Sequence, residues 1–171
     1  MWEYNGERRP DFAQTPGPNQ ESVWDYPRPP RLAPDGRLVQ VRAGQRLLAD
    51  SRRACRVLET ASPPTFYLPP DDVAVELLRP VAGRSWCEWK GEAFYFALAD
   101  GDAAAPPVAW SYPNPRPAFV AIAGYLSFYP ARVECTVDGE RVRPQPGGFY
   151  GGWITDEIVG PFKGPPGTGH W

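Results

Sequence analysis

Short apolar runs separated by proline and glycine dominate the hydrophobic pattern of this 171-residue chain. Runs such as Thr65–Leu68 and Ala93–Leu98 are brief and rich in aromatic residues, which is typical of β-strands. The 23 prolines are spread along the chain and disfavour long helices. The pattern therefore predicts a mainly β protein of short antiparallel strands joined by rigid turns, with a few short helical turns.

The clearest local signal is a hairpin at Asp138-Gly139. This dipeptide separates the apolar run Val133–Val137 from Arg141–Val142, and Asp-Gly suits the tight two-residue turns that connect antiparallel strands. The run Arg52–Glu59 fits either a helix or a strand, with a lean towards a strand.

Three short helical segments are also predicted, one of them a single helical turn at Phe119–Gly124. Pro69-Pro70-Asp71-Asp72 has the proline and the carboxylates of a helix start, so a helix is expected over Val73–Leu78, ended by Pro80. Thr155 is expected to cap a single helical turn at Asp156–Val159.

The distribution of proline and glycine predicts one domain with two tails. Residues 1–20 are polar and rich in Pro and Gly, which indicates an N-terminal tail that is extended or draped over the body. Residues 21–163 carry the predicted strands and form the β-rich domain, and residues 164–171 form a C-terminal tail.

Charge and hydropathy exclude two classes of partner. A net charge of −2 and a pI near 5.5 argue against a nucleic-acid partner, which requires clustered Lys and Arg. No run approaches the 18 or so apolar residues of a membrane span, and the N-terminus has no apolar signal region. The chain is expected to be soluble and cytoplasmic.

Cysteine and histidine are too few for the common metal and triad sites. The three cysteines, Cys55, Cys87 and Cys135, form no CxxC pair, and the single histidine, His170, stands next to the C-terminus. We therefore expect no metal and no cofactor, and a Ser-His-Asp triad has no candidate histidine.

The stretch Ser85–Trp89 holds the best candidate chemistry. It is a predicted strand that enters a turn at Lys90–Glu92, and alternation along the strand places Glu88 and Lys90 on one face. Lys90 is one of only two lysines, against sixteen arginines. Glu88 is the candidate general base or anchor and Lys90 the candidate acid or anion contact. The alternative is a surface ion pair worth about 0.2–1 kcal/mol.

Aromatic residues are the second feature of the chain, with 23 Phe, Trp and Tyr. They form either the core of a small β domain or the wall of a pocket in which a planar ligand stacks. The candidate ligand-binding residues are Trp86, Glu88, Lys90, Trp110, Tyr112, Tyr125, Tyr129 and Trp153.

Six stretches together resemble one family. They are Glu21–Pro30, Leu58–Tyr67, Cys87–Gly91, Ala109–Pro113, Ile122–Pro130 and Gln145–Trp153. The family is the bacterial and fungal domain of unknown function 427, which also carries the label "nucleotidyltransferase domain". The resemblance covers about residues 21–163 and implies a β-tent topology like that of methionine sulfoxide reductase B. Zinc-binding CxxC pairs of β-tent relatives are missing here, and Ser62 stands where many members have histidine.

The function favoured by the sequence is binding of a small planar or polar organic ligand in an aromatic-lined pocket. One alternative is a metal-independent enzyme that uses Glu88 and Lys90. A nucleotidyltransferase is less favoured, because the Asp100-Gly101-Asp102 motif is explained by turn formation and no phosphate-binding loop is present. The last alternative is a protein-interaction domain that uses the Pro-aromatic segments.

Overall fold

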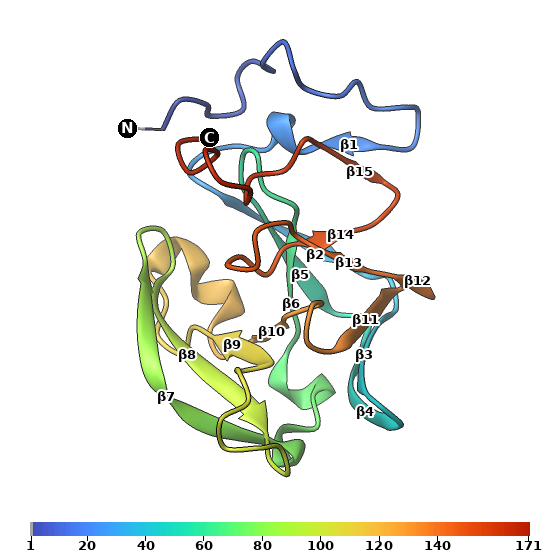
Figure 1. Cartoon of the computed structure of the whole chain (residues 1–171), viewed down its shortest axis with the longest axis vertical. Helices are drawn as coiled ribbons and strands as arrows, with labels where there is room; N and C mark the ends of the chain where they lie inside the picture. Colours follow the sequence, from blue (N-terminus) through green and yellow to red (C-terminus); the bar gives the residue numbers. More distant parts are fainter. Residues whose placement is uncertain (1) are drawn as a thin grey trace.

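The computed structural model describes residues 2–171 and shows short β-strands arranged in several small sheets (Figure 1). Helical structure in this range is limited to short 3-10 segments. The mainly β prediction is thus confirmed. None of the helical segments in residues 2–171 has the length and apolar content that a membrane crossing requires.

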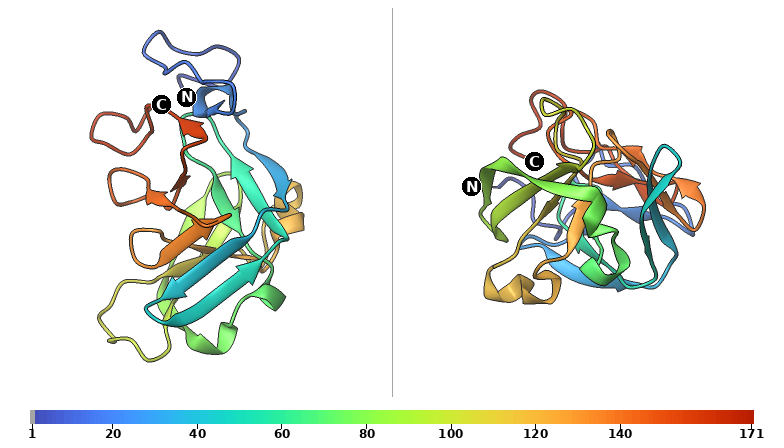
Figure 2. Two further views of the ribbon diagram at one scale, coloured as in Figure 1. Left: turned by 90° about the vertical axis from the view of Figure 1, so that its right-hand side faces the viewer. Right: turned by 90° about the horizontal axis from the view of Figure 1, so that it is seen from below.

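Two four-stranded antiparallel sheets and one three-stranded sheet form most of the molecule (Figure 2). The first has the order β10-β9-β8-β7, and its strands are β7 Leu78–Cys87, β8 Gly91–Leu98, β9 Ala109–Ser111 and β10 Leu126–Phe128. The second has the order β12-β11-β3-β4, and its strands are β3 Val39–Ala43, β4 Arg46–Ser51, β11 Glu134–Val137 and β12 Glu140–Arg141. The third has the order β2-β5-β6, and its strands are β2 Arg31–Asp35, β5 Ala54–Leu58 and β6 Thr65–Tyr67.

Two strand pairs and four 3-10 segments complete the fold. The parallel pair is β1 Glu21–Ser22 with β15 Ile158–Val159, and the antiparallel pair is β13 Arg143–Pro144 with β14 Trp153–Ile154. The 3-10 segments are η1 Val23–Asp25, η2 Pro70–Asp72, η3 Val75–Leu77 and η4 Pro117–Ile122.

The hairpin expected at Asp138-Gly139 is present as β11 and β12, and the ambiguous run Arg52–Glu59 contains strand β5. Both outcomes follow from local chemistry. Asp138 has a φ of 47° and Gly139 a φ of 81°, the left-handed conformations that this turn requires. The Asp138 carboxylate also accepts a hydrogen bond from the backbone N–H of Leu38 at 2.8 Å.

The helix predictions were only partly right. The turn expected at Phe119–Gly124 corresponds to η4, whereas the segment expected over Val73–Leu78 contains only the 3-10 turn η3, because backbone pairing with distant strands overrides local propensity. Such pairing also replaces the turn expected at Asp156–Val159. Val73 forms an antiparallel bridge with Ala49, and the N–H of Ala74 donates to the carbonyl of Leu48 at 2.8 Å. Pro80 lies in β7, the edge strand of its sheet, where a missing N–H is tolerated. At the second site, Ile158 pairs with Glu21 in the parallel β1–β15 ladder instead of forming a helical turn.

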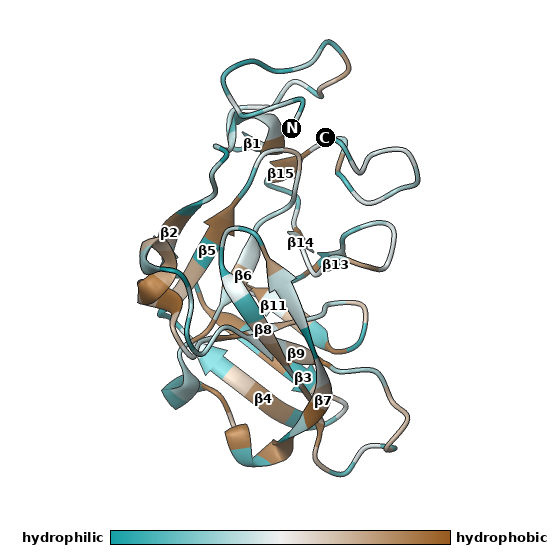
Figure 3. Cartoon of the chain, turned by 90° about the vertical axis from the view of Figure 1, so that its left-hand side faces the viewer, coloured by the Kyte–Doolittle hydropathy of each residue, from teal (hydrophilic) through white to brown (hydrophobic). Residues whose placement is uncertain are grey.

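The main apolar core lies between the sheets and includes Val41, Leu48, Leu68 and Phe128, all fully buried. Hydrophobic segments follow the strands, whereas the loop near the N-terminus is mainly hydrophilic (Figure 3). A second cluster, made largely of aromatic residues, adjoins the candidate site.

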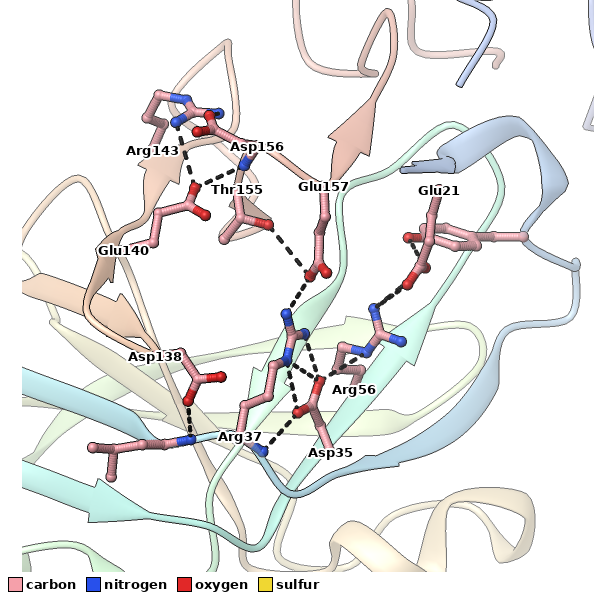
Figure 4. A network of polar contacts seen from close by, with 12 residues as sticks. Glu21, Asp35, Arg37, Arg56, Asp138, Glu140, Arg143, Thr155, Asp156 and Glu157 are labelled. Atoms are coloured by element: carbon pink, nitrogen blue, oxygen red, sulfur yellow. Dashed lines mark hydrogen bonds and ion pairs between the residues drawn. The ribbon is translucent and has the colours of Figure 1, made fainter. Parts of the chain in front are cut away.

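A network of charged side chains ties the third sheet to the two ends of the chain (Figure 4). Arg37 lies between Asp35 and Glu157, with nitrogen–oxygen distances of 2.6 Å and 2.5 Å. Arg56 pairs with the same Asp35 at 3.3 Å and with Glu21 at 3.1 Å. Each charge in this group faces an opposite charge, so the group holds together segments that are far apart in sequence.

The two ends of the chain meet at one end of the molecule (Figure 1). Phe12 stacks on Trp171 with ring centroids 5.1 Å apart, and both rings lie against Trp24, which is fully buried. Residues 2–20 therefore pack on the body through aromatic contacts although they form no strand or helix.

Candidate functional site

A cavity of about 550 Å³ lies beside the end of the β7–β8 hairpin. Its wall is formed by the β7–β8 turn, by residues 57–67 of the third sheet, by residues from β9, and by the loop 145–151. Trp2 and Lys163, from opposite ends of the chain, complete it.

The cavity brings together six of the eight residues that the sequence nominated, namely Trp86, Glu88, Lys90, Trp110, Tyr112 and Tyr129. The other two, Tyr125 and Trp153, lie outside its wall. Trp153 is fully buried in the main core, where its indole N–H donates to the carbonyl of Phe128 at 2.9 Å and its ring stacks on Phe66. Tyr125 packs against the aromatic cluster.

The predicted placement of Glu88 and Lys90 on one strand face was wrong. The strand β7 ends at Cys87, and Glu88–Lys90 form the turn to β8. Gly91 has a φ of 101°, which favours glycine and closes the turn. The Lys90 carbonyl accepts a hydrogen bond from the N–H of Arg116 at 3.0 Å, which fixes the turn against η4. As a result Glu88 is exposed, whereas Lys90 is only 8% exposed.

The Lys90 ammonium is surrounded mainly by aromatic rings. It lies 5.5 Å from the centroid of the Tyr112 ring and 6.0 Å from that of Phe119, which are cation–π distances. Burial acts to lower the pKa of Lys90, but Tyr67, Cys87 and Glu59 act to raise it, and the net pKa is raised. Lys90 therefore carries its charge at neutral pH.

Two buried tyrosines adjoin Lys90. The Tyr67 hydroxyl accepts a hydrogen bond from the Trp110 indole N–H at 3.0 Å. Burial raises the pKa of Tyr67 and of Tyr112, so both hydroxyls are neutral at physiological pH. The part of the cavity around Lys90, Tyr67 and Tyr112, which we call its floor, thus combines one positive charge with neutral phenol groups.

The Trp2 side chain lines another part of the cavity wall. Its indole N–H donates to the Glu88 carboxylate at 3.0 Å. Two cations lie over the indole, the Lys163 ammonium at 3.9 Å and the Arg28 guanidinium at 4.3 Å from the ring centroid. Lys163 also donates to the carbonyl of Trp171 at 3.2 Å. Burial, and then Arg28, lower the pKa of Lys163.

Glu59 is a second carboxylate in the cavity wall. Its Oε1 atom accepts hydrogen bonds from Arg28 Nε at 3.2 Å and from the Trp89 indole N–H at 3.3 Å. Sequence reasoning missed Glu59, Trp2 and Lys163. The rarity of lysine was a usable signal for Lys163, because both lysines of the chain line this one cavity. Trp2 stood in a presumed tail, and no local pattern marked it.

Comparison with protein families gives one match to the chain. The family model described as Domain of unknown function (DUF427) matches residues 31–139. The chain belongs to the DUF427 family. No significant match was found among curated proteins.

The DUF427 match covers only part of the cavity wall. It contains Glu59, the β7–β8 turn with Lys90, and Trp110, Tyr112 and Tyr129. Three parts of the wall lie outside residues 31–139, namely Trp2, the loop 145–151 and Lys163. The part of the wall around Lys90 therefore belongs to the stretch that matches DUF427, whereas these three parts come from its flanks.

The carboxylates considered for nucleotidyl transfer are engaged elsewhere. Asp100 forms an ion pair with Arg46 at 2.7 Å, and the Asp102 carboxylate accepts from the N–H of Ala104 at 2.8 Å. Neither residue lines the cavity. Within residues 2–171, His, Cys, Asp and Glu side chains form no group of three or more that could hold a metal ion.

Proposed function

We propose that this DUF427 member binds a small planar or polar organic molecule in the cavity. The observation that carries the proposal is the composition of the wall, in which aromatic rings lie around two buried ammonium groups, those of Lys90 and Lys163. Ligand sites are typically concave, largely apolar and about 300–1,000 Å³ in volume, with a few placed polar groups. The cavity of about 550 Å³ has these properties.

The packing of the rest of the molecule supports the same proposal. Protein interiors are close-packed, and voids much larger than a water molecule are few. The main core follows this rule through contacts such as the Phe66–Trp153 stack at 4.8 Å. The aromatic rings beside the β7–β8 turn instead leave a space of ligand size between them.

A catalytic role for Glu88 and Lys90 has weaker support. The Glu88 carboxylate is exposed and binds the Trp2 indole, whereas Lys90 is buried against Tyr112 and Phe119. An acid–base pair needs both groups within reach of the same reacting atoms. Recognition of a ligand by Lys90 requires no such pairing.

Two tyrosines of similar partial burial allow a matched test. Tyr129 lines the cavity, and its ring centroid lies 4.5 Å from that of Trp110. Tyr125 packs against the same aromatic cluster without lining the cavity. In a screen of planar heteroaromatic compounds by ligand-observed NMR, Tyr129→Ala should weaken binding of a hit about tenfold or more, because a stacking face is lost. Tyr125→Ala should leave its affinity unchanged.

The result that would overturn the proposal is clear in this design. Absence of any binding compound, or equal weakening by Tyr129→Ala and Tyr125→Ala, would show that the aromatic residues serve the fold alone. Thermal unfolding of both variants supplies the check that each remains folded.

A further inference from the structure

The charged groups that lie deepest in the structure differ in one respect. Asp35 faces Arg37 and Arg56, and the Arg28 guanidinium, only 2% exposed, faces Glu59. Lys163 donates to a backbone carbonyl. Lys90, by contrast, forms neither an ion pair with a carboxylate nor a hydrogen bond to a carbonyl among the described residues.

Burial of the Lys90 ammonium carries a desolvation cost. Its neighbours favour the charged form, so that its pKa is raised, but no carboxylate lies within ion-pair distance of it. The rings of Tyr112 and Phe119 offset part of this cost through cation–π contacts. The Cys87 thiol, a weak hydrogen-bonding neighbour of Lys90, adds little.

The choice of lysine at this position also points to a ligand. The chain uses arginine at sixteen positions and lysine at two. The ion pairs of the structure that contain a cationic side chain other than His170 all use arginine. A lysine ammonium is a compact point charge with three donors, which suits a small oxyanion at the bottom of a narrow site.

The acidic groups of the wall form no ion pair with Lys90. Glu59 favours the charged form of Lys90, but its Oε1 atom accepts from Arg28 and Trp89, and the Glu88 carboxylate accepts from Trp2. The Lys90 ammonium is therefore left without an ion-pair partner in the cavity wall, beside the Tyr112 ring.

We infer that the ligand is a planar organic anion whose single oxyanion group, a carboxylate or a phosphate, binds the Lys90 ammonium while its ring lies among the aromatic side chains of the wall. This inference rests on the proposed function, because it specifies the ligand class of the same cavity. It assigns Lys90 as the residue that selects for charge.

The test uses three probes that share one ring system: 1-naphthoate, 1-naphthamide and 1-naphthyl phosphate. The amide has nearly the shape of the acid but no charge. Affinities are measured at pH 7 by isothermal titration calorimetry or by NMR titration on the full chain. At least one of the two anions is expected to bind ten or more times more tightly than the amide, and the better anion identifies the oxyanion.

Three variants locate the effect. Lys90→Met keeps the length and apolar volume of the side chain and should lower the affinity of the preferred anion to that of the amide. Arg84→Met removes one positive charge that does not line the cavity and should leave the preference intact. Lys90→Gln is the second neutral variant, in case Lys90→Met does not fold.

The outcomes separate the two proposals. If the amide binds as tightly as both anions, or if Lys163→Met removes the preference while Lys90→Met does not, the inference is overturned and the cavity remains a ligand site. If none of the three probes and no compound of the wider screen binds, the proposed function itself fails.

Discussion

Charge is buried in two ways in this molecule. In the network around Arg37, three side chains each form ion pairs with two partners, namely Asp35, Arg37 and Arg56, and the Arg37–Glu157 pair joins positions 120 residues apart. At the floor of the cavity, the Lys90 ammonium meets aromatic rings and a thiol instead of a carboxylate. Both regions contain buried charge, but the first pairs it with opposite charges and the second does not.

The difference separates a structural charge from a charge available for recognition. A paired group has its interactions fulfilled inside the fold, so it stabilises the fold and offers little to a ligand. An unpaired group keeps its interactions available for a ligand, which is a common property of binding sites. Removal of the central cation should therefore destabilise the first region much more than the second.

The largest effect is expected from Arg37→Met. The substitution leaves the nearly buried Asp35 carboxylate with a single cation and Glu157 with none, which should lower the free energy of unfolding by about 2–3 kcal/mol. Urea denaturation at pH 7 measures the change. The control is Arg9→Met, which removes an ion pair with Asp25 at the surface and should cause no measurable loss. Equal losses in the two variants would contradict the assigned role of the network.

The pH dependence of the same pair gives the second prediction. Burial acts to raise the pKa of Asp35, but Arg37 lowers it by more, so that the folded-state pKa lies below the ordinary value of 3.8. The carboxylate therefore contributes stability above pH 3.8, and this contribution is lost as the pH falls through its folded-state pKa. At pH values below the folded-state pKa of Asp35, the difference in free energy of unfolding between the wild type and Arg37→Met should be at most half of its value at pH 7.

Denaturation curves collected from pH 7 down to pH 2.5 check this second prediction. A difference that stays constant over the range would show that Arg37 stabilises the fold by packing and not by charge.

The smallest effect is expected from Lys90→Met. The substitution removes a buried cation that has no ion pair and keeps apolar volume, so the free energy of unfolding should change by less than about 1 kcal/mol. The measurement is again urea denaturation at pH 7, with Arg84→Met as the control for loss of one positive charge. A loss of stability comparable to that of Arg37→Met would erase the contrast between the two regions and make Lys90 a structural residue.

Local chemistry explains which parts of the fold were predictable. The Asp138-Gly139 hairpin was foreseen because the dipeptide itself has the backbone preference that the turn needs. The helix expected over Val73–Leu78 is reduced to the 3-10 turn Val75–Leu77, because the backbone before this turn pairs with Leu48 and Ala49, which no local pattern predicts. The mainly β class could be predicted, whereas the pairing of distant segments could not.

The same distinction holds for the site. The β7–β8 turn and its aromatic neighbours were recognised because several chemically unusual residues stand together in the sequence. Trp153 was placed with them on aromatic character alone, but the hydrogen bond to Phe128 holds it in the core. Trp2 and Lys163 reach the cavity from the two ends of the chain, through contacts that only the folded structure reveals.

The composition of the cavity wall has a spectroscopic consequence. Four of the seven tryptophans, Trp2, Trp86, Trp89 and Trp110, line the cavity, whereas Trp24, Trp153 and Trp171 lie elsewhere. The intrinsic emission of the protein is therefore dominated by indoles within contact distance of anything that enters. The chain carries its own unlabelled reporter of occupancy, with three remote indoles as an internal reference.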